Sequence, residues 1–193
     1  MLNWVFKDIN FTFEHLGVYA ILGANGSGKS TLMRIIAGMQ NHSSGKIHYD
    51  NNGVAIESDK IFDYISYCAP AMDIIEEMTL KEFLTFHFSF KKIIPGYSIE
   101  QIIDEMNLGK FKHQLIMEYS SGMKQRVKLA QAFFTDAPIL FLDEPTSNLD
   151  LDGVNLYLTW LKKFGHNRIT IVGSNDDREY PNPIGTIVMN DYK

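Results

Sequence analysis

The chain has 193 residues, a length that suits one domain and leaves room for a second only as a small insertion. Hydrophobic residues make up 45% of the chain and charged residues 21%, which excludes a disordered chain and a collagen-like or coiled-coil fibre. The net charge of -5 argues against a nucleic-acid partner or a polybasic membrane anchor, and the single cysteine, Cys68, excludes an internal disulfide and fits a reducing cytosol.

The first third of the chain predicts a buried strand, a helix and a tight turn. Residues 18–22 form a short apolar run that stops at a glycine, which is typical of a strand in a parallel sheet. A helix is expected over residues 29–39. Residues 45–53 predict a strand that enters a tight turn at Asn52 and Gly53.

The middle third predicts helices. Thr79 and Glu82 form a capping box, and Ser98 and Gln101 form a second one. Each box marks the start of a helix. We therefore expect residues 71–135 to form a helical insertion into a core made of residues 1–70 and 136–193.

The last third returns to strands. Alternation of strands with helices predicts an α/β fold with an open, mostly parallel sheet flanked by helices. No apolar run approaches the ~18 residues of a membrane span, so action at a membrane would need another chain. The predicted elements are a strand at 139–142, a helix at 153–164 and strands at 168–173 and 186–189.

A glycine-rich motif follows the first strand. Residues 23–30, Gly-Ala-Asn-Gly-Ser-Gly-Lys-Ser, match G-x-x-x-x-G-K-[ST] at every fixed position. Such a loop lets successive backbone N–H groups converge on phosphate oxygens, and the helix N-terminus adds partial positive charge. The alternative is a glycine-rich turn that binds nothing. The predicted nucleotide-binding residues are Gly23, Ala24, Asn25, Gly26, Ser27, Gly28, Lys29, Ser30 and Thr31.

Two acidic residues end the strand predicted at 139–142. That strand delivers Asp143 to the C-terminal edge of the sheet, where ligands of open α/β sheets bind. Asp143 and the Ser30 hydroxyl can hold Mg²⁺, and Glu144 can polarise a water for in-line attack on a γ-phosphate. A strand that merely ends in a polar turn is the alternative, which the glycine-rich motif disfavours.

The segment between these motifs narrows the choice. Residues 119–134, which begin Tyr-Ser-Ser-Gly-Met-Lys-Gln-Arg, resemble the signature segment of ABC-type ATPases, whose usual form is L-S-G-G-Q-x-Q-R. Residues 147–150, Ser-Asn-Leu-Asp, resemble the D-loop of that family. The order of phosphate loop, signature, acidic strand and D-loop covers nearly the whole chain, and this signature form is most similar to the ATP-binding subunits of export-type transporters.

The resemblance implies a fold, partners and a chemistry. The fold would be the ABC type of P-loop NTPase, with an antiparallel β element and a helical subdomain. The signature of one copy would contact the ATP held by a second, so that two ATP molecules with Mg²⁺ join a homo- or heterodimer. Hydrolysis would drive a separate transmembrane permease, which places the chain on the cytoplasmic face of the cell membrane. The implied residues are Ser120, Ser121, Gly122 and Met123 in the signature, Asp150 in the D-loop, Glu144 and Asn175 in catalysis, and Ser30 and Asp143 as metal ligands.

Four features depart from the family pattern. Pro70 stands where the family usually has a glutamine, and Asn175 stands where it has a switch histidine. Ser121 and Met123 replace a glycine and a glutamine in the signature. The adenine-stacking aromatic would fall at or before residue 1, and the nearest aromatic, Trp4, is predicted to be a core strand residue instead. These departures predict slow turnover, or a partner that completes the site.

Two other functions compete with ATP-driven transport. An ATP-binding clamp or regulatory dimer with negligible hydrolysis is favoured by Pro70 and Asn175. A small nucleotide kinase has a similar length and phosphate loop, but the signature and the D-loop argue against it. The phenylalanines after Thr79 are interpreted as the core of the helical insertion, although some of them could dock a membrane subunit. They are Phe83, Phe86, Phe88 and Phe90.

Overall fold

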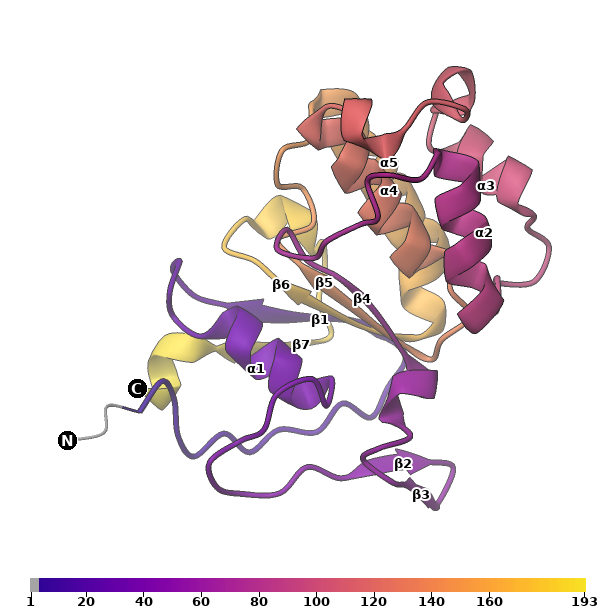
Figure 1. Cartoon of the computed structure of the whole chain (residues 1–193). Helices are drawn as coiled ribbons and strands as arrows, with labels where there is room; N and C mark the ends of the chain where they lie inside the picture. Colours follow the sequence, from indigo (N-terminus) through magenta and orange to yellow (C-terminus); the bar gives the residue numbers. More distant parts are fainter. Residues whose placement is uncertain (1–3) are drawn as a thin grey trace.

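The computed structural model describes residues 4–193 and is built on a five-stranded sheet (Figure 1). The strands lie in the order β4-β5-β6-β1-β7, and every neighbouring pair is parallel. The predicted α/β class with a mostly parallel sheet is therefore confirmed. The strands are β1 (Gly17–Leu22), β4 (Ile65–Cys68), β5 (Ile139–Asp143), β6 (Ile169–Gly173) and β7 (Gly185–Val188).

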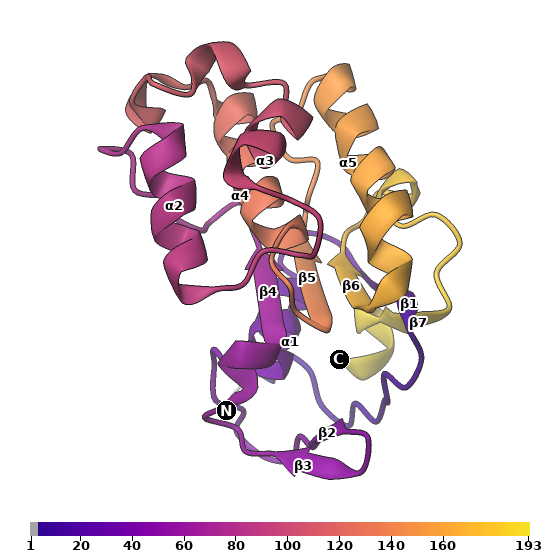
Figure 2. The same ribbon diagram turned by 90° about the vertical axis from the view of Figure 1, so that its right-hand side faces the viewer.

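Helices cover both faces of this sheet (Figures 1 and 2). Helix α1 lies on one face, whereas α4 and α5 lie on the other, with α2 packed against α4 and α3 against α2. The antiparallel hairpin of β2 and β3 stands apart from the sheet. Within residues 4–193 no helix combines the length and the apolar character needed to cross a lipid bilayer. These elements are α1 (Lys29–Ile36), β2 (Tyr49–Asn51), β3 (Val54–Ile56), α2 (Leu80–Phe90), α3 (Ile99–Glu105), α4 (Ser121–Phe133) and α5 (Leu151–Phe164).

Alternation along the strands builds two cores, one on each face of the sheet. Because the sheet is covered on both sides, its inner strands are buried on both faces and are mostly apolar. Trp160 of α5 is fully buried, and its truncation to alanine would cost about 3–5 kcal/mol. The core under α4 and α5 includes Val18, Leu140, Val172 and Trp160, and the core under α1 includes Ile21, Met33, Phe141 and Ile171.

The predicted helix starts and the predicted turn form where the local sequence places them. Both predicted capping boxes form, at the starts of α2 and α3. The predicted turn joins β2 to β3, with a φ of 53° at Asn52 and 83° at Gly53. Positive φ at both central residues is what a two-residue hairpin turn of the favoured hand demands.

Some predicted boundaries, and one predicted burial, are wrong. The helix expected to reach residue 39 ends at Ile36, because Gly38 adopts a left-handed φ of 71°. Helix α5 begins at Leu151 rather than 153, because Asp150 caps it. The prediction that Trp4 is a core strand residue fails, since its side chain is 58% exposed and residues 4–14 form no strand. The position expected for the adenine-stacking aromatic lies outside the described residues.

The cluster of phenylalanines on α2 is divided between core and surface. Phe83 is buried and Phe88 packs partly buried against the same core, which agrees with the core interpretation. Phe86 and Phe90 are exposed instead, with their ring centroids 5.2 Å apart. One turn of helix separates the two exposed rings, so they share a face of α2 that no described element covers.

A half-buried histidine joins α2 to the segment that follows α4. The Thr135 hydroxyl donates to the Gln131 carbonyl, so it can only accept from His87 Nε2, 3.1 Å away. Burial lowers the pKa of His87 to about 4, and the Lys91 ammonium contributes to the shift. His87 is therefore neutral in the folded protein at pH values where an unfolded chain would protonate it.

We expect the free energy of unfolding to fall as the pH drops from 6.5 to about 4. In this window the unfolded chain binds a proton at His87 and the folded chain does not, so acid favours unfolding, by at most about 3 kcal/mol. Urea titrations at several pH values would measure the slope. The control is His87→Gln, which has no titrating ring and should flatten the slope; equal slopes would contradict the prediction.

Candidate functional site

Three polar segments follow β1, β5 and β6 at the same edge of the sheet (Figure 1). The strand register sets Ile21 beside Gly173 and Gly173 beside Asp143, so the three strand ends form one row. A Cβ atom on Gly173 would lie 2.4 Å from Met33 Sδ and 3.3 Å from Asp143 Oδ1. Glycine in the middle of the row therefore leaves room for the Met33 thioether and, beside it, for the carboxylate.

The predicted phosphate loop, residues 23–30, leads from β1 into α1. A Cβ atom on Gly23 would lie 2.4 Å from Ser27 Oγ, so the loop can close only with glycine there. Gly28 has a φ of 104° and begins α1 without a side-chain cap, and the first turn holds no acidic residue. The first N–H groups of α1 are consequently available to an anion. Ser27 Oγ is buried and has no hydrogen-bond partner within residues 4–193.

Lys29 lies across this loop with its side chain 4% exposed. Its ammonium donates to the Gly23 carbonyl at 2.7 Å and to the Ala24 carbonyl at 3.4 Å. It also lies 4.0 Å from Glu144 Oε1. A buried ammonium needs such partners, because desolvation without them would be costly. The cation thus stands between the glycine-rich loop and the acidic end of β5.

Asp143 is buried, and its Oδ1 atom has no hydrogen-bond partner in the described part of the chain. Burial raises the pKa of Asp143, an effect that the hydrogen bond with Ser30 opposes and the Glu144 carboxylate reinforces. A free carboxylate oxygen beside a serine hydroxyl is the kind of oxygen donor set that Mg²⁺ prefers. The residues present therefore fit the predicted metal site.

Glu144 occupies a backbone conformation that glutamate seldom adopts. Its φ is 43°, in the left-handed region, and its N–H donates to the Gly173 carbonyl at 2.9 Å. Its side chain is 37% exposed and faces Lys29. The backbone of Glu144 is thus fixed, whereas its side chain is partly open to solvent.

Comparison with known proteins agrees with this geometry. The family model described as ABC transporter matches residues 6–147, which is more than half of the chain. The chain belongs to the ABC transporter family. It is 30% identical over 170 residues to the uncharacterized ABC transporter ATP-binding protein YhcH of Bacillus subtilis, covering 85% of this chain and 54% of that protein. It is 31% identical over 178 residues to ABC transporter A family member 1 of Dictyostelium discoideum, covering 90% of this chain and 20% of that protein.

Solved structures of ATP-binding proteins share the fold. An ABC transporter ATP-binding protein from Pyrococcus furiosus superposes with a TM-score of 0.80 at 23% identity, covering 98% of this chain and 92% of that one. A dimeric ATP-binding cassette in a post-hydrolysis state with ADP and Pi gives a TM-score of 0.77 at 22% identity, covering 91% and 82%. The ABC ATPase type of P-loop fold is thereby confirmed. The chain spans about half of the first curated relative and a fifth of the second.

The segments that resemble the ABC signature and D-loop meet within this chain. Ser120 caps α4 by accepting from the Met123 N–H at 3.2 Å, and both Ser120 and Ser121 are exposed. A Cβ atom on Gly122 would lie 2.9 Å from the Asn148 carbonyl oxygen, so only glycine allows this approach of the two segments. Asp150 caps α5 through the Gly153 N–H and pairs with Arg126 at 2.7 Å.

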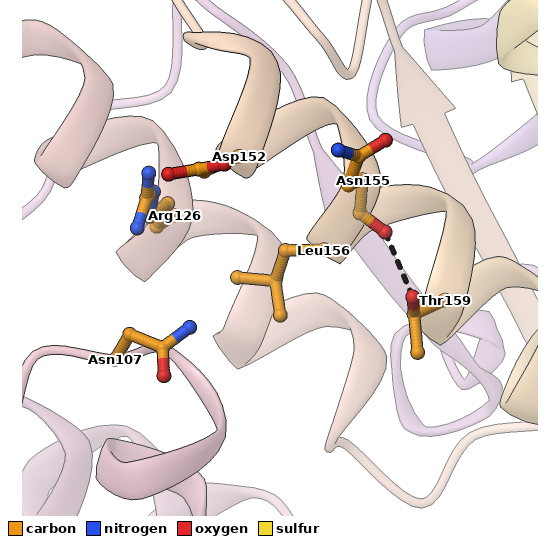
Figure 3. A pocket seen from close by; sticks show the side chains of 6 residues that line it. All are labelled: Asn107, Arg126, Asp152, Asn155, Leu156 and Thr159. Carbon is orange, nitrogen blue, oxygen red and sulfur yellow. Dashed lines mark hydrogen bonds between the residues drawn. The ribbon is translucent and has the colours of Figure 1, made fainter.

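A hollow of about 400 Å³ lies beside this pair, between α4, α5 and the segment after α3 (Figure 3). In Figure 3 the Arg126 and Asp152 side chains stand near one end of it, and the Thr159 hydroxyl donates to the Asn155 carbonyl. No residue of the phosphate loop lines it. It is therefore distinct from the strand-edge site. Its lining residues are Asn107, Arg126, Asp152, Asn155, Leu156 and Thr159.

The two departures from the family's catalytic pattern sit in different surroundings. Asn175 is exposed, just beyond the end of β6. Pro70 follows β4, and its carbonyl accepts from the Lys128 ammonium of α4 at 2.7 Å. The segment at the expected glutamine position is thus tied to the signature helix by a lysine.

Sequence reasoning missed three polar residues that support the site. Gln125 and Lys128 lie inside the segment that resembles the signature, but the motif predicts no role for either, and Glu179 lies outside every motif. Gln125 donates to the Pro145 carbonyl at 2.9 Å, and Glu179 accepts from the Thr146 N–H at 2.9 Å. Lys124 and Arg126 flank Gln125, so the local sequence gives no signal of its burial, and only the fold reveals its partner.

We expect the free energy of unfolding of unliganded Asp143→Asn to equal that of the wild type or to exceed it by up to about 1 kcal/mol. The substitution removes a buried charge that has an unpartnered oxygen. Binding of a Mg²⁺-nucleotide should weaken at least about tenfold, because the anionic oxygen is lost. Scanning calorimetry and titration calorimetry would measure the two effects. Unchanged nucleotide affinity in the presence of Mg²⁺ would contradict the metal assignment.

Proposed function

We propose that this chain is the ATP-binding and ATP-hydrolysing subunit of an ABC transporter. The observation that supports this most directly is the placement of the buried Lys29 ammonium 4.0 Å from the Glu144 carboxylate, where α1 begins with free N–H groups. Phosphoryl transfer from ATP to water requires a cation, amide donors and a water-activating base at one place. Membership of the ABC transporter family supports the same proposal.

The proposed chemistry follows from the position of each group. The phosphates of ATP would lie against residues 23–31, and Lys29 would exchange its carbonyl contacts for β- and γ-phosphate oxygens. Ser30 and Asp143 would hold Mg²⁺, which neutralises phosphate charge when bound. Glu144 would polarise the water that attacks the γ-phosphorus in line.

We propose further that a second copy or a related subunit completes the site. The signature residues Ser120 and Ser121 are exposed at the start of α4, so they are accessible to the nucleotide of another subunit. The solved cassette bound to ADP and Pi is dimeric, and the same assembly is proposed for this chain. The full set of contacts across the dimer would be Ser120, Ser121, Gly122 and Met123, with Asp150 in the D-loop.

The membrane partner would dock on the helical part of the chain. We propose that residues 71–135 form this unit and that a transmembrane permease binds it, holding the chain at the cytoplasmic face of the membrane. Phe86 and Phe90, 44% and 71% exposed, provide an apolar contact. Phe86 also lines an open hollow of about 580 Å³ between α2 and His113. An exposed apolar pair beside a hollow is a common form of docking surface.

An ATP-binding clamp with negligible turnover is the second candidate. Asn175 cannot carry a titrating proton, and Pro70 offers only its carbonyl, which Lys128 already occupies. In this alternative ATP would close the dimer and stay bound. Phosphate release measured with and without the membrane partner would distinguish the two functions.

We expect Glu144→Gln to trap an ATP-bound dimer, because the amide keeps the shape of the side chain but cannot act as a base. Gel filtration with MgATP should show the dimer, and phosphate release should fall at least about a hundredfold. Lys29→Ala is the control that should abolish ATP binding and dimer together. A Glu144→Gln protein that stays monomeric with ATP would rule out the proposed dimer.

We expect MgATP to change the tryptophan fluorescence of the wild type through Trp4. Trp4 is 58% exposed, and its neighbour Val5 has a Cγ1 atom only 2.8 Å from where a Cβ of Gly28 would stand. The other tryptophan, Trp160, is fully buried. A fluorescence titration should therefore report binding, and Trp4→Phe should remove the signal without removing binding by calorimetry. A signal that survives in Trp4→Phe would contradict this prediction.

A further inference from the structure

The turn that carries Glu144 is held by groups from outside its own strand. The Glu144 N–H donates to Gly173 of β6, the Pro145 carbonyl accepts from Gln125 of α4, and the Thr146 N–H donates to Glu179. Three consecutive residues are thus each fixed through one backbone group, and each partner comes from a different segment. A non-glycine residue keeps a left-handed φ only where its surroundings enforce it, and Glu144 has a φ of 43°.

Glu179 provides the most constrained of these contacts. It is 5% exposed and lies in the 3-10 turn Asp177–Glu179, which follows β6 and Asn175. Its Oε1 atom accepts from both the N–H and the hydroxyl of Thr146. The Tyr157 hydroxyl of α5 donates to the Glu179 carbonyl and so fixes the 3-10 turn to α5. The carboxylate therefore connects the segment after β5 to the segment after β6.

Gln125 makes the matching contact from the signature helix. Its side chain is 2% exposed, and its amide donates to the Pro145 carbonyl at 2.9 Å. The same helix begins at Ser120, so movement at the start of α4 would act on the turn through this hydrogen bond. Gln125 and Glu179 thus hold adjacent residues of the turn from α4 and from the loop after β6.

The burial of Glu179 argues for a purpose beyond stability. Its Oε2 atom is buried without a hydrogen-bond partner in the described part of the chain. A buried carboxylate oxygen left bare is unfavourable, and an apolar side chain would avoid that penalty. What glutamate supplies here, and an apolar residue would not, is an acceptor for both donors of Thr146.

We propose that Gln125 and Glu179 form a clamp that sets the backbone at Glu144 and so directs its carboxylate at the site of hydrolysis. Both are positioning residues, because neither touches the nucleotide phosphates or the attacking water in the proposed chemistry. The catalytic part of this inference rests on the proposed function, since it takes Glu144 as the base. The structural part, control of the turn by the two side chains, does not.

The test compares Glu179→Ala and Glu179→Gln in the full chain. Glu179→Ala removes the acceptor for Thr146, so kcat should fall at least about tenfold while KM and the calorimetric affinity for MgATP stay within about twofold. Glu179→Gln keeps an amide oxygen that can accept the same hydrogen bonds, so kcat should return to within about threefold of the wild type. If Glu179→Ala does not fold, Gln125→Leu provides the second test. Leucine is close to glutamine in size, and kcat should fall in the same way.

Glu105→Ala is the matched control. Glu105 accepts from Lys163, Tyr97 and Trp160 and joins α3 to α5, away from the strand-edge site. Its loss should lower the melting temperature and leave kcat unchanged. Equal losses of kcat in Glu105→Ala and Glu179→Ala would mean that general destabilisation explains the effect, and would overturn the proposal.

Hydrogen exchange at the Thr146 amide supplies a readout that needs no ATP. Protection of this amide should fall at least about tenfold in Glu179→Ala and persist in Glu179→Gln. Unchanged protection in Glu179→Ala would overturn the clamp itself, and lost protection with unchanged kcat would overturn its catalytic part. If the wild type binds MgATP without hydrolysing it, the hydrolysis in the proposed function is refuted. The catalytic part of the clamp proposal is then refuted with it. The exchange data still test whether the clamp holds the turn.

Discussion

The parallel register that aligns Ile21, Gly173 and Asp143 governs the geometry of the whole site. It brings the ends of β1, β6 and β5 to one edge, so a cationic loop from one strand faces acidic residues from another. Glycine in the central strand leaves space for the Met33 side chain and, less tightly, for the Asp143 carboxylate. Every other contact of the site, including that between Lys29 and Glu144, depends on this alignment.

The site is built at the expense of stability. Ser27 Oγ and Asp143 Oδ1 are buried without hydrogen-bond partners in the described chain, and Glu144 holds a left-handed backbone conformation. Each buried polar atom without a partner costs about 1–3 kcal/mol. Such local violations of folding rules are typical of functional sites, and the two apolar cores offset them. A bound phosphate and Mg²⁺ would satisfy both oxygen atoms at once.

The helical layer is connected to this edge by polar side chains as well as by the apolar core. Lys128 holds the carbonyl of Pro70, and Gln125 holds the carbonyl of Pro145. Both residues project from α4, the helix that begins with the exposed signature serines. Pro70, at the position where the resemblance predicts a glutamine, is therefore linked to the signature helix through its backbone oxygen.

The sequence alone determined what depends on local chemistry: the fold class, the capping boxes of α2 and α3, the turn at Asn52 and Gly53, and the motifs around Lys29 and Asp143. These follow from backbone preferences and residue spacing, which neighbours in the chain decide. Only the tertiary structure decided the exposure of Trp4, the split of the phenylalanine cluster, and the partners of Gln125, Lys128 and Glu179. Those outcomes depend on contacts between residues far apart in sequence, and no local pattern encodes which buried polar group meets which backbone atom.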